Sequence, residues 1–165
     1  MAVQTTYQHP VAGIPGLVLD TRNRTVVSRA AFGGDGTIQF GAGIIQGPNP
    51  GKDAMANDGT GTMRTFEGVV SAWMTTEQRY PGGGDYIKDK ETLNVLQQGA
   101  VWVRLSEGEN PAYGDAVYLA PDGTFSAVDG VALNARFIGS AIIEGIAPAE
   151  FFGGEIKIVE VEVEP

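Results

Sequence analysis

Short apolar runs that alternate with polar residues and end at glycine-rich turns dominate this chain. Val101, Val103 and Leu105 alternate with Trp102 and Arg104, which places the aliphatic side chains on one face of a half-buried strand. Similar runs predict further strands at residues 17–19, 25–28, 38–40, 44–45, 66–73, 116–119, 137–143 and 156–163. The pattern therefore predicts an all-β protein.

Turn residues between these runs indicate how the strands connect. Asp122-Gly123 predicts a two-residue hairpin turn with positive φ angles, so that the chain folds back toward Phe125. Many short strands joined by glycine and proline turns favour a single jelly-roll-like β-sandwich or barrel over residues 16–165. Residues 1–15, which contain Pro10 and Pro15, are expected to form an extended N-terminal arm.

Two further features of the pattern bear on the fold. Single helical turns are expected at most at residues 53–57 and at 134–137 or 148–152, none of them long enough to be a framework helix. In the last strand the apolar face changes phase between Ile158 and Val159, after which valines alternate with glutamates. Either a β-bulge lies there or the first half of the strand is buried on both faces.

Several motifs follow one another in a fixed order along the chain: residues 16–20 and 38–47, a G-x-V-x-V strand from Gly99, a G-D-A-V-Y strand from Gly114, and a D-G-x-F turn from Asp122. In their order and spacing these motifs resemble the structural cement proteins of phages. A glycine- and asparagine-rich insertion at residues 47–62 is longer than the corresponding loop of the family.

Membership of that family implies a decoration role without a reaction or a cofactor. Cement proteins bind the outer face of an assembled icosahedral capsid in many copies and bridge neighbouring major-capsid subunits. The implied partners are the major capsid protein and further copies of this chain, as a dimer or trimer. The implied location is the outer capsid surface of the virion, after synthesis in the host cytoplasm.

Composition agrees with a small structural domain and excludes several classes of site. The chain has 165 residues, which is enough to bury a stable core without disulfides or bound metals. It has no cysteine. Thiolate catalysis, zinc-cysteine sites and disulfides are therefore excluded. The N-terminus lacks the basic and apolar regions of a signal peptide, and no apolar run approaches the ~20 residues of a membrane span. We expect no membrane partner.

The charge distribution is uneven along the chain. The net charge is −9, yet residues 1–52 carry four basic and two acidic side chains. Nucleic-acid binding needs clustered Lys and Arg, so we expect no nucleic-acid partner and a position outside the shell. We hypothesise that the basic segment from Arg22 to Arg29 faces an acidic capsid surface, while the acidic C-terminal end faces solvent.

Candidate chemistry is weak throughout the sequence. His9 is the only histidine, and no nucleophile-elbow sequence surrounds any serine. The carboxylate pairs Asp85 with Asp89 and Glu107 with Glu109 lie in polar loops without an apolar pocket to separate their pKa values. Residues 53–59 have a calcium-like content but lack alternating ligands. We therefore expect no catalytic, cofactor or metal site.

Interface residues are the remaining candidates. Aromatic and basic side chains in the arm, in the basic segment and near the triple glycine are expected to contact the capsid or another copy: Tyr7, His9, Arg22, Arg24, Arg29, Trp73, Tyr80 and Tyr86. Two other functions stay open. One is a different virion module, such as a tail or fibre-base protein; the other is a glycan-binding β-sandwich with Trp73 and Trp102 as a stacking platform.

Overall fold

The computed structural model describes residues 15–18, 24–33, 38–72, 86–138, 143–144 and 157–163. Within these ranges every regular element is a strand, so the predicted all-β class is confirmed. The twelve strands are β1 (Thr25–Ala31), β2 (Ile38–Gln39), β3 (Gly43–Gln46), β4 (Asp53–Ala56), β5 (Phe66–Ser71), β6 (Tyr86–Ile87), β7 (Thr92–Arg104), β8 (Ala116–Leu119), β9 (Phe125–Ser126), β10 (Val131–Phe137), β11 (Ile143–Glu144) and β12 (Lys157–Val163).

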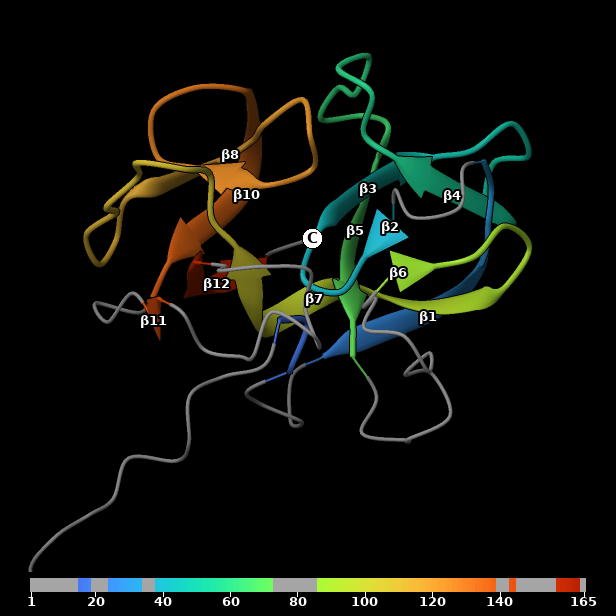
Figure 1. Cartoon of the computed structure of the whole chain (residues 1–165), viewed down its shortest axis with the longest axis horizontal. Helices are drawn as coiled ribbons and strands as arrows, with labels where there is room; N and C mark the ends of the chain where they lie inside the picture. Colours follow the sequence, from blue (N-terminus) through green and yellow to red (C-terminus); the bar gives the residue numbers. More distant parts are fainter. Residues whose placement is uncertain are drawn as a thin grey trace, which may run out of the picture.

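Five strands close into a barrel on one side of the molecule. Their order is β1-β4-β3-β5-β7, and β7 pairs back with β1, so the ring has no free edge. All pairings are antiparallel except that of β1 with β4. The short pair β2–β6 lies beside this ring (Figure 1). Of the two predicted forms, sandwich or barrel, the structure contains a barrel.

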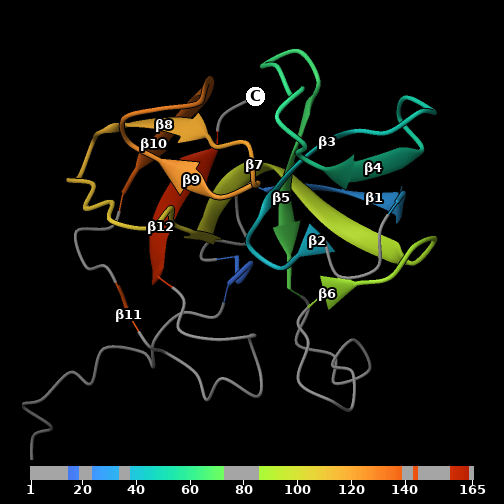
Figure 2. The ribbon, with the colours of Figure 1, turned by 45° about the horizontal axis from the view of Figure 1, so that its top comes forward.

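The remaining strands form a second half around the other end of β7. Here the order is β7-β12-β10-β8-β9, and β11 pairs with β12 (Figure 2). An isolated parallel bridge joins Leu105, just after β7, to Phe125 in β9. Through this bridge the last strand of the series, β9, lies next to the end of β7, where the series began. The two halves therefore share a single continuous strand.

β7 changes partner where it bends. Its residues up to Leu96 pair with β5, whereas those from Gly99 onward pair with β12. Gly99 has a φ of 127°, a backbone conformation that residues with a side chain rarely adopt. The half-buried strand expected at residues 101–105 is wrong in one respect. Trp102 is only 8% exposed and Arg104 only 7%, so this end of β7 is buried on both faces.

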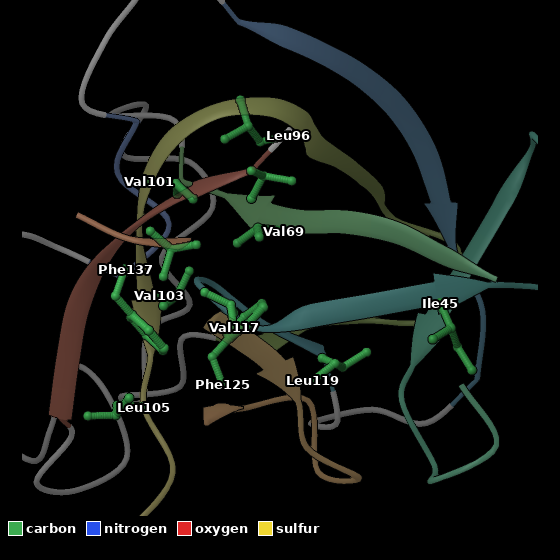
Figure 3. Close-up of a cluster of buried hydrophobic side chains, with 12 residues drawn as sticks. Ile45, Val69, Leu96, Val101, Val103, Leu105, Val117, Leu119, Phe125 and Phe137 are labelled. Carbon is green, nitrogen blue, oxygen red and sulfur yellow. The ribbon is translucent and has the colours of Figure 1, made fainter. Parts of the chain in front are cut away.

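Two apolar clusters stabilise these halves. The smaller cluster fills the region of the closed barrel and includes Ile44, Val70 and Val95. The larger cluster joins residues of both halves, including Val69 of β5 and Phe125 of β9 (Figure 3). Because one cluster spans both halves, they pack as one unit.

The hairpin at Asp122-Gly123 is one residue longer than predicted. The Gly123 N–H donates to the Ala120 carbonyl oxygen at 3.0 Å, and the Ala120 N–H donates to the Thr124 carbonyl oxygen at 2.9 Å. Of the two predicted turn residues, Gly123 has a positive φ, of 81°, and Asp122 does not. This is a three-residue loop with Pro121 in the first turn position, where its fixed φ suits a type I turn.

Several local predictions are corrected by the strands. The helical turn expected at residues 53–57 is wrong, since Asp53–Ala56 form β4, and residues 134–137 belong to β10. The third helical candidate, at 148–152, lies outside the described residues. β12 pairs with β7 in unbroken register from Ile158 to Val163, so the bulge, one of the two alternatives for the change of phase, is absent from this pairing. The insertion at residues 47–62 contributes β4 to the barrel rather than a plain loop.

No helix that could cross a bilayer occurs within the described ranges.

Candidate interaction surface

A groove of about 300 Å³ opens where the two halves of the molecule diverge from β7. Its apolar lining comes from the loop before β5, from β5 itself, from β10 and from the end of β12: Met63, Phe66, Leu133 and Val163. Its polar lining comes from β1, β5, β7 and β10: Thr25, Glu67, Gln97, Gln98 and Asn134. Four apolar groups set among amides, a hydroxyl and a carboxylate suit a peptide better than a highly charged ligand.

Glu67 forms the most buried polar element of this groove. Its side chain is only 8% exposed, and Glu67 Oε2 lies 3.0 Å from Arg29 Nε in β1. The other carboxylate oxygen accepts a hydrogen bond from Gln46 Nε2 of β3 at 3.2 Å. With both oxygens bonded, the buried charge is compensated. These contacts also tie β1, β3 and β5 together below the groove.

The loop that carries Met63 is anchored at both ends. Asn57 Nδ2 donates to the Ala120 carbonyl oxygen at 2.7 Å, while Asn57 Oδ1 accepts from the Gly61 N–H at 3.1 Å. Further along, the Thr62 N–H donates to Thr65 Oγ1 at 2.9 Å. Met63 is nevertheless 59% exposed. An apolar side chain is thus held at the rim of the groove by a loop with its own hydrogen bonds.

Two titratable groups in the described residues have perturbed pKa values. Hydrogen bonds from the hydroxyl and N–H of Thr60 lower the pKa of exposed Asp58. Burial lowers the pKa of Arg104 to about 10, so its guanidinium is still charged at neutral pH. Arg104 Nε donates to the Phe40 carbonyl oxygen at 2.9 Å, which holds the chain after β2 against β7. Neither group lines the groove.

A second exposed surface lies on the loops around β8, β9 and β10. Tyr113 is 67% exposed and Val128 is 78% exposed there. Glu109, in the loop between β7 and β8, joins this loop to the end of β9, since its Oε1 accepts from Ser126 Oγ at 2.7 Å. This surface carries acidic residues but no basic residue between Arg104 and Arg136. It is therefore an acidic surface with isolated apolar side chains rather than a groove.

Most of the predicted interface residues cannot be placed. Five of them lie outside the described residues: Tyr7, His9, Arg22, Trp73 and Tyr80. Tyr86 begins β6, where its backbone is opposite Gln39, and its side chain is not described. Arg24 is exposed just before β1. Arg29 is the one candidate close to the groove, through its ion pair with Glu67.

Sequence reasoning missed the groove itself. The available signal was Glu67 itself, a charged residue inside an apolar run, because a buried carboxylate in a strand needs a partner. Gln97 and Gln98 gave no signal, since two polar residues within a long strand also fit a solvent-facing edge. Met63 lies in a polar loop, and its exposure follows only from the fold.

The described residues give no support to a metal site, an unpaired buried polar site or a glycan-stacking site. No group of three or more His, Asp or Glu side chains that could hold a metal ion occurs among them. Every fully buried side-chain nitrogen or oxygen there has a hydrogen-bond partner. Trp102 is buried, so the glycan-stacking hypothesis loses one of its two tryptophans.

Comparison with known proteins gives a family and a fold. Residues 3–163 match the family described as Structural cement protein (E217 gp24/Pam3 gp6). A chain of the solved structure titled "The capsid of Myoviridae Phage XM1" has a similar fold, with a TM-score of 0.62 at 16% identity. That alignment covers 96% of this chain and 97% of the other. No curated protein matches the sequence. Because the family match spans nearly the whole chain, this protein belongs to the structural cement proteins of phages.

Proposed function

We propose that this protein binds the outer surface of an assembled icosahedral phage shell and stabilises the shell by bridging major-capsid subunits. The observation that carries the proposal is the family match over residues 3–163. The net charge of −9 supports an outer position, because an acidic protein is repelled by packaged genome. The protein acts through binding, with no chemical step.

Stabilisation follows from binding the assembled state and not the separate subunits. A ligand that binds only one state shifts the equilibrium toward it, by an amount that grows with ligand concentration. Contacts to two subunits across one seam add through effective concentration. A rigid, strand-built scaffold suits this role, because little conformational entropy is lost when it docks.

Co-sedimentation with empty, expanded capsids of the cognate phage tests the proposal. We expect saturable binding that raises the melting temperature of the capsid. Absence of binding at every stoichiometry would contradict the decoration role. Binding to isolated tails instead would assign the protein to a tail or fibre-base module.

A charge-reversal series tests the hypothesis that the basic segment faces the capsid. Arg22→Glu with Arg24→Glu should weaken capsid binding more than Lys52→Glu with Lys90→Glu, which changes the net charge equally at two exposed positions elsewhere. Arg29 is left intact, since its loss would unpair buried Glu67 and confuse binding with folding. Equal weakening by the two pairs would refute a specific basic contact.

Reversal at the acidic end provides the opposite comparison. Glu160→Lys with Glu164→Lys should leave capsid binding intact if this end faces solvent. Glu162 is not changed, because it forms an exposed ion pair with Arg136 at 2.6 Å. Loss of binding in this variant would place the acidic end at the capsid contact.

A further inference from the structure

The groove beside β7 is built in a way that core packing does not explain. Met63 stays 59% exposed although its loop is held by hydrogen bonds from Asn57 and between Thr62 and Thr65. The amide of Gln97 lines the same groove and makes no hydrogen bond to the described residues. An exposed apolar group and an unused amide within one groove indicate a place for another polypeptide.

We propose that this groove receives the N-terminal segment, residues 1–14, of a second copy of this chain, with Tyr7 as the anchor. The interaction is a contact between copies of this protein. It does not rest on capsid binding and can be tested without a capsid.

The chemistry of the segment matches that of the groove. Residues 1–14 contain no Lys, Arg, Asp or Glu, and amides and hydroxyls are supplied by Gln4, Thr5, Thr6 and Gln8. The side-chain amide of Gln97 can pair with such groups and with peptide N–H and C=O groups, since it offers two donors and an acceptor. A segment without acidic residues also avoids repulsion by Glu67, whose charge is already paired with Arg29.

Tyr7 suits the mixed lining of the groove. A tyrosine buries a rigid ring and keeps one hydroxyl for a polar partner, which is why tyrosines anchor many interfaces. The ring would pack on Met63, Phe66 and Leu133, with the hydroxyl near the amide of Gln97. A volume of about 300 Å³ accommodates one aromatic side chain with its flanking backbone.

The direction of the chain at residues 16–18 favours the groove of another copy. Val18 is opposite Val101, and the Gly16 N–H donates to the Trp102 carbonyl oxygen at 2.7 Å. From Val18 back to Gly16 the chain therefore runs along β7 from Val101 toward Trp102. The groove lies the other way, at Gln97 and Gln98. Residues 16–18 therefore point their N-terminal end away from the groove of the same chain. Fourteen residues in a fully extended conformation would span about 46 Å.

Disulfide trapping tests the contact directly, because the chain has no native cysteine. Full-length Tyr7→Cys protein is mixed with full-length Met63→Cys protein, oxidised, and separated on a non-reducing gel. We expect a covalent heterodimer in several-fold excess over a mixture of Tyr7→Cys with Tyr113→Cys, whose target is similarly exposed but lies on the acidic surface. Equal yields in the two mixtures would overturn the proposal.

A Tyr7→Cys, Met63→Cys double variant separates the two possible origins of the segment. Covalent dimers and larger species support exchange between copies. An oxidised product at the mass of one chain, 17.3 kDa, in which no free thiol remains, would overturn the proposal in favour of a segment that binds its own groove. A product at that mass with both thiols still free would overturn the proposed contact as well.

Measurement of oligomeric state by light scattering gives an independent check without oxidation. Met63→Glu should lower the solution mass toward that of one chain, whereas Val128→Glu, at a more exposed position on the other surface, should leave the mass unchanged. A wild-type protein that is monomeric at all accessible concentrations, or a Met63→Glu variant with unchanged mass, would contradict the proposed contact.

Discussion

Replacement of Asn57 tests how the loop that carries Met63 is held in place. The side chain of Asn57 is 7% exposed and makes three hydrogen bonds: to the Ala120 carbonyl oxygen at 2.7 Å, and from the N–H groups of Gly61 at 3.1 Å and Gly59 at 3.3 Å. At a net ~0.5–1.5 kcal/mol for each hydrogen bond, Asn57→Ala should cost about 3 kcal/mol. That loss corresponds to a fall of about 6–12 °C in Tm for a chain of this size.

Asn57→Asp gives a sharper test because its effect depends on pH. The new carboxylate still accepts from the two glycines, but it places negative charge against the Ala120 carbonyl oxygen. Burial and this repulsion raise the pKa of the new carboxyl in the folded state above its unfolded value of about 3.9. The protonated form can donate to Ala120. The variant should therefore lose stability as the pH rises through the raised folded pKa, and recover it below the unfolded pKa.

Urea unfolding followed by tryptophan fluorescence measures these differences, since Trp102 is buried in the folded protein. The range from pH 5.5 to 8 avoids the isoelectric point near 4.5, where the protein is expected to associate. Asn57→Ala should show a constant deficit relative to wild type, and Asn57→Asp a deficit that grows with pH. Asn110→Asp, the same change at an exposed site, should do neither. A deficit for Asn57→Asp without pH dependence would refute the assigned hydrogen bond to Ala120.

Three further substitutions test the packing. Gly43→Ala should cost about 1–3 kcal/mol in urea unfolding, because its Cβ would clash with Leu119 Cδ1 and lie 2.9 Å from the ring of Phe125. Leu119→Val in the same chain, which removes that Cδ1, should recover part of the loss. Arg104→Ala should lower the free energy of unfolding by about 3 kcal/mol, because it leaves the Phe40 carbonyl oxygen without its donor. Arg136→Ala, the control, removes an exposed ion pair and should lower it by less than about 1 kcal/mol. Lys90→Gly should raise Tm slightly, since Lys90 has a φ of 66°, whereas Lys88→Gly should lower it; a loss in both would contradict the assigned backbone strain.

The strands were predictable wherever side-chain alternation reports burial of one face. Val117 and Leu119, fully buried in β8, follow that rule, as does the return of the chain to Phe125. The rule fails at Trp102 and Arg104, which are both buried. At Arg104 the chain after β2 lies against β7, where the Phe40 carbonyl oxygen accepts from Arg104 Nε. No local pattern reports such tertiary coverage.

The loops were harder to predict because their order depends on distant partners. Asn57 is bonded to Ala120, which lies 63 residues further along the chain, so nothing near residue 57 indicates the contact. Residues 53–57 were expected to form a helical turn because Ala and Met favour helices, yet pairing with β1 and β3 makes residues 53–56 a strand. The groove combines both difficulties, since its lining comes from five separate strands and one loop.

The sharing of β7 by both halves determines how the protein responds to mechanical load. A force that pulls the two halves apart runs along the covalent backbone of this 13-residue strand, a span of about 43 Å, rather than through a linker. To separate the halves, β7 would have to slide along β1 and β5, or along β12, and the hydrogen bonds between these strands would have to break together. Strands loaded in shear share tension across many bonds at once, so this domain should deform as one body until it yields abruptly.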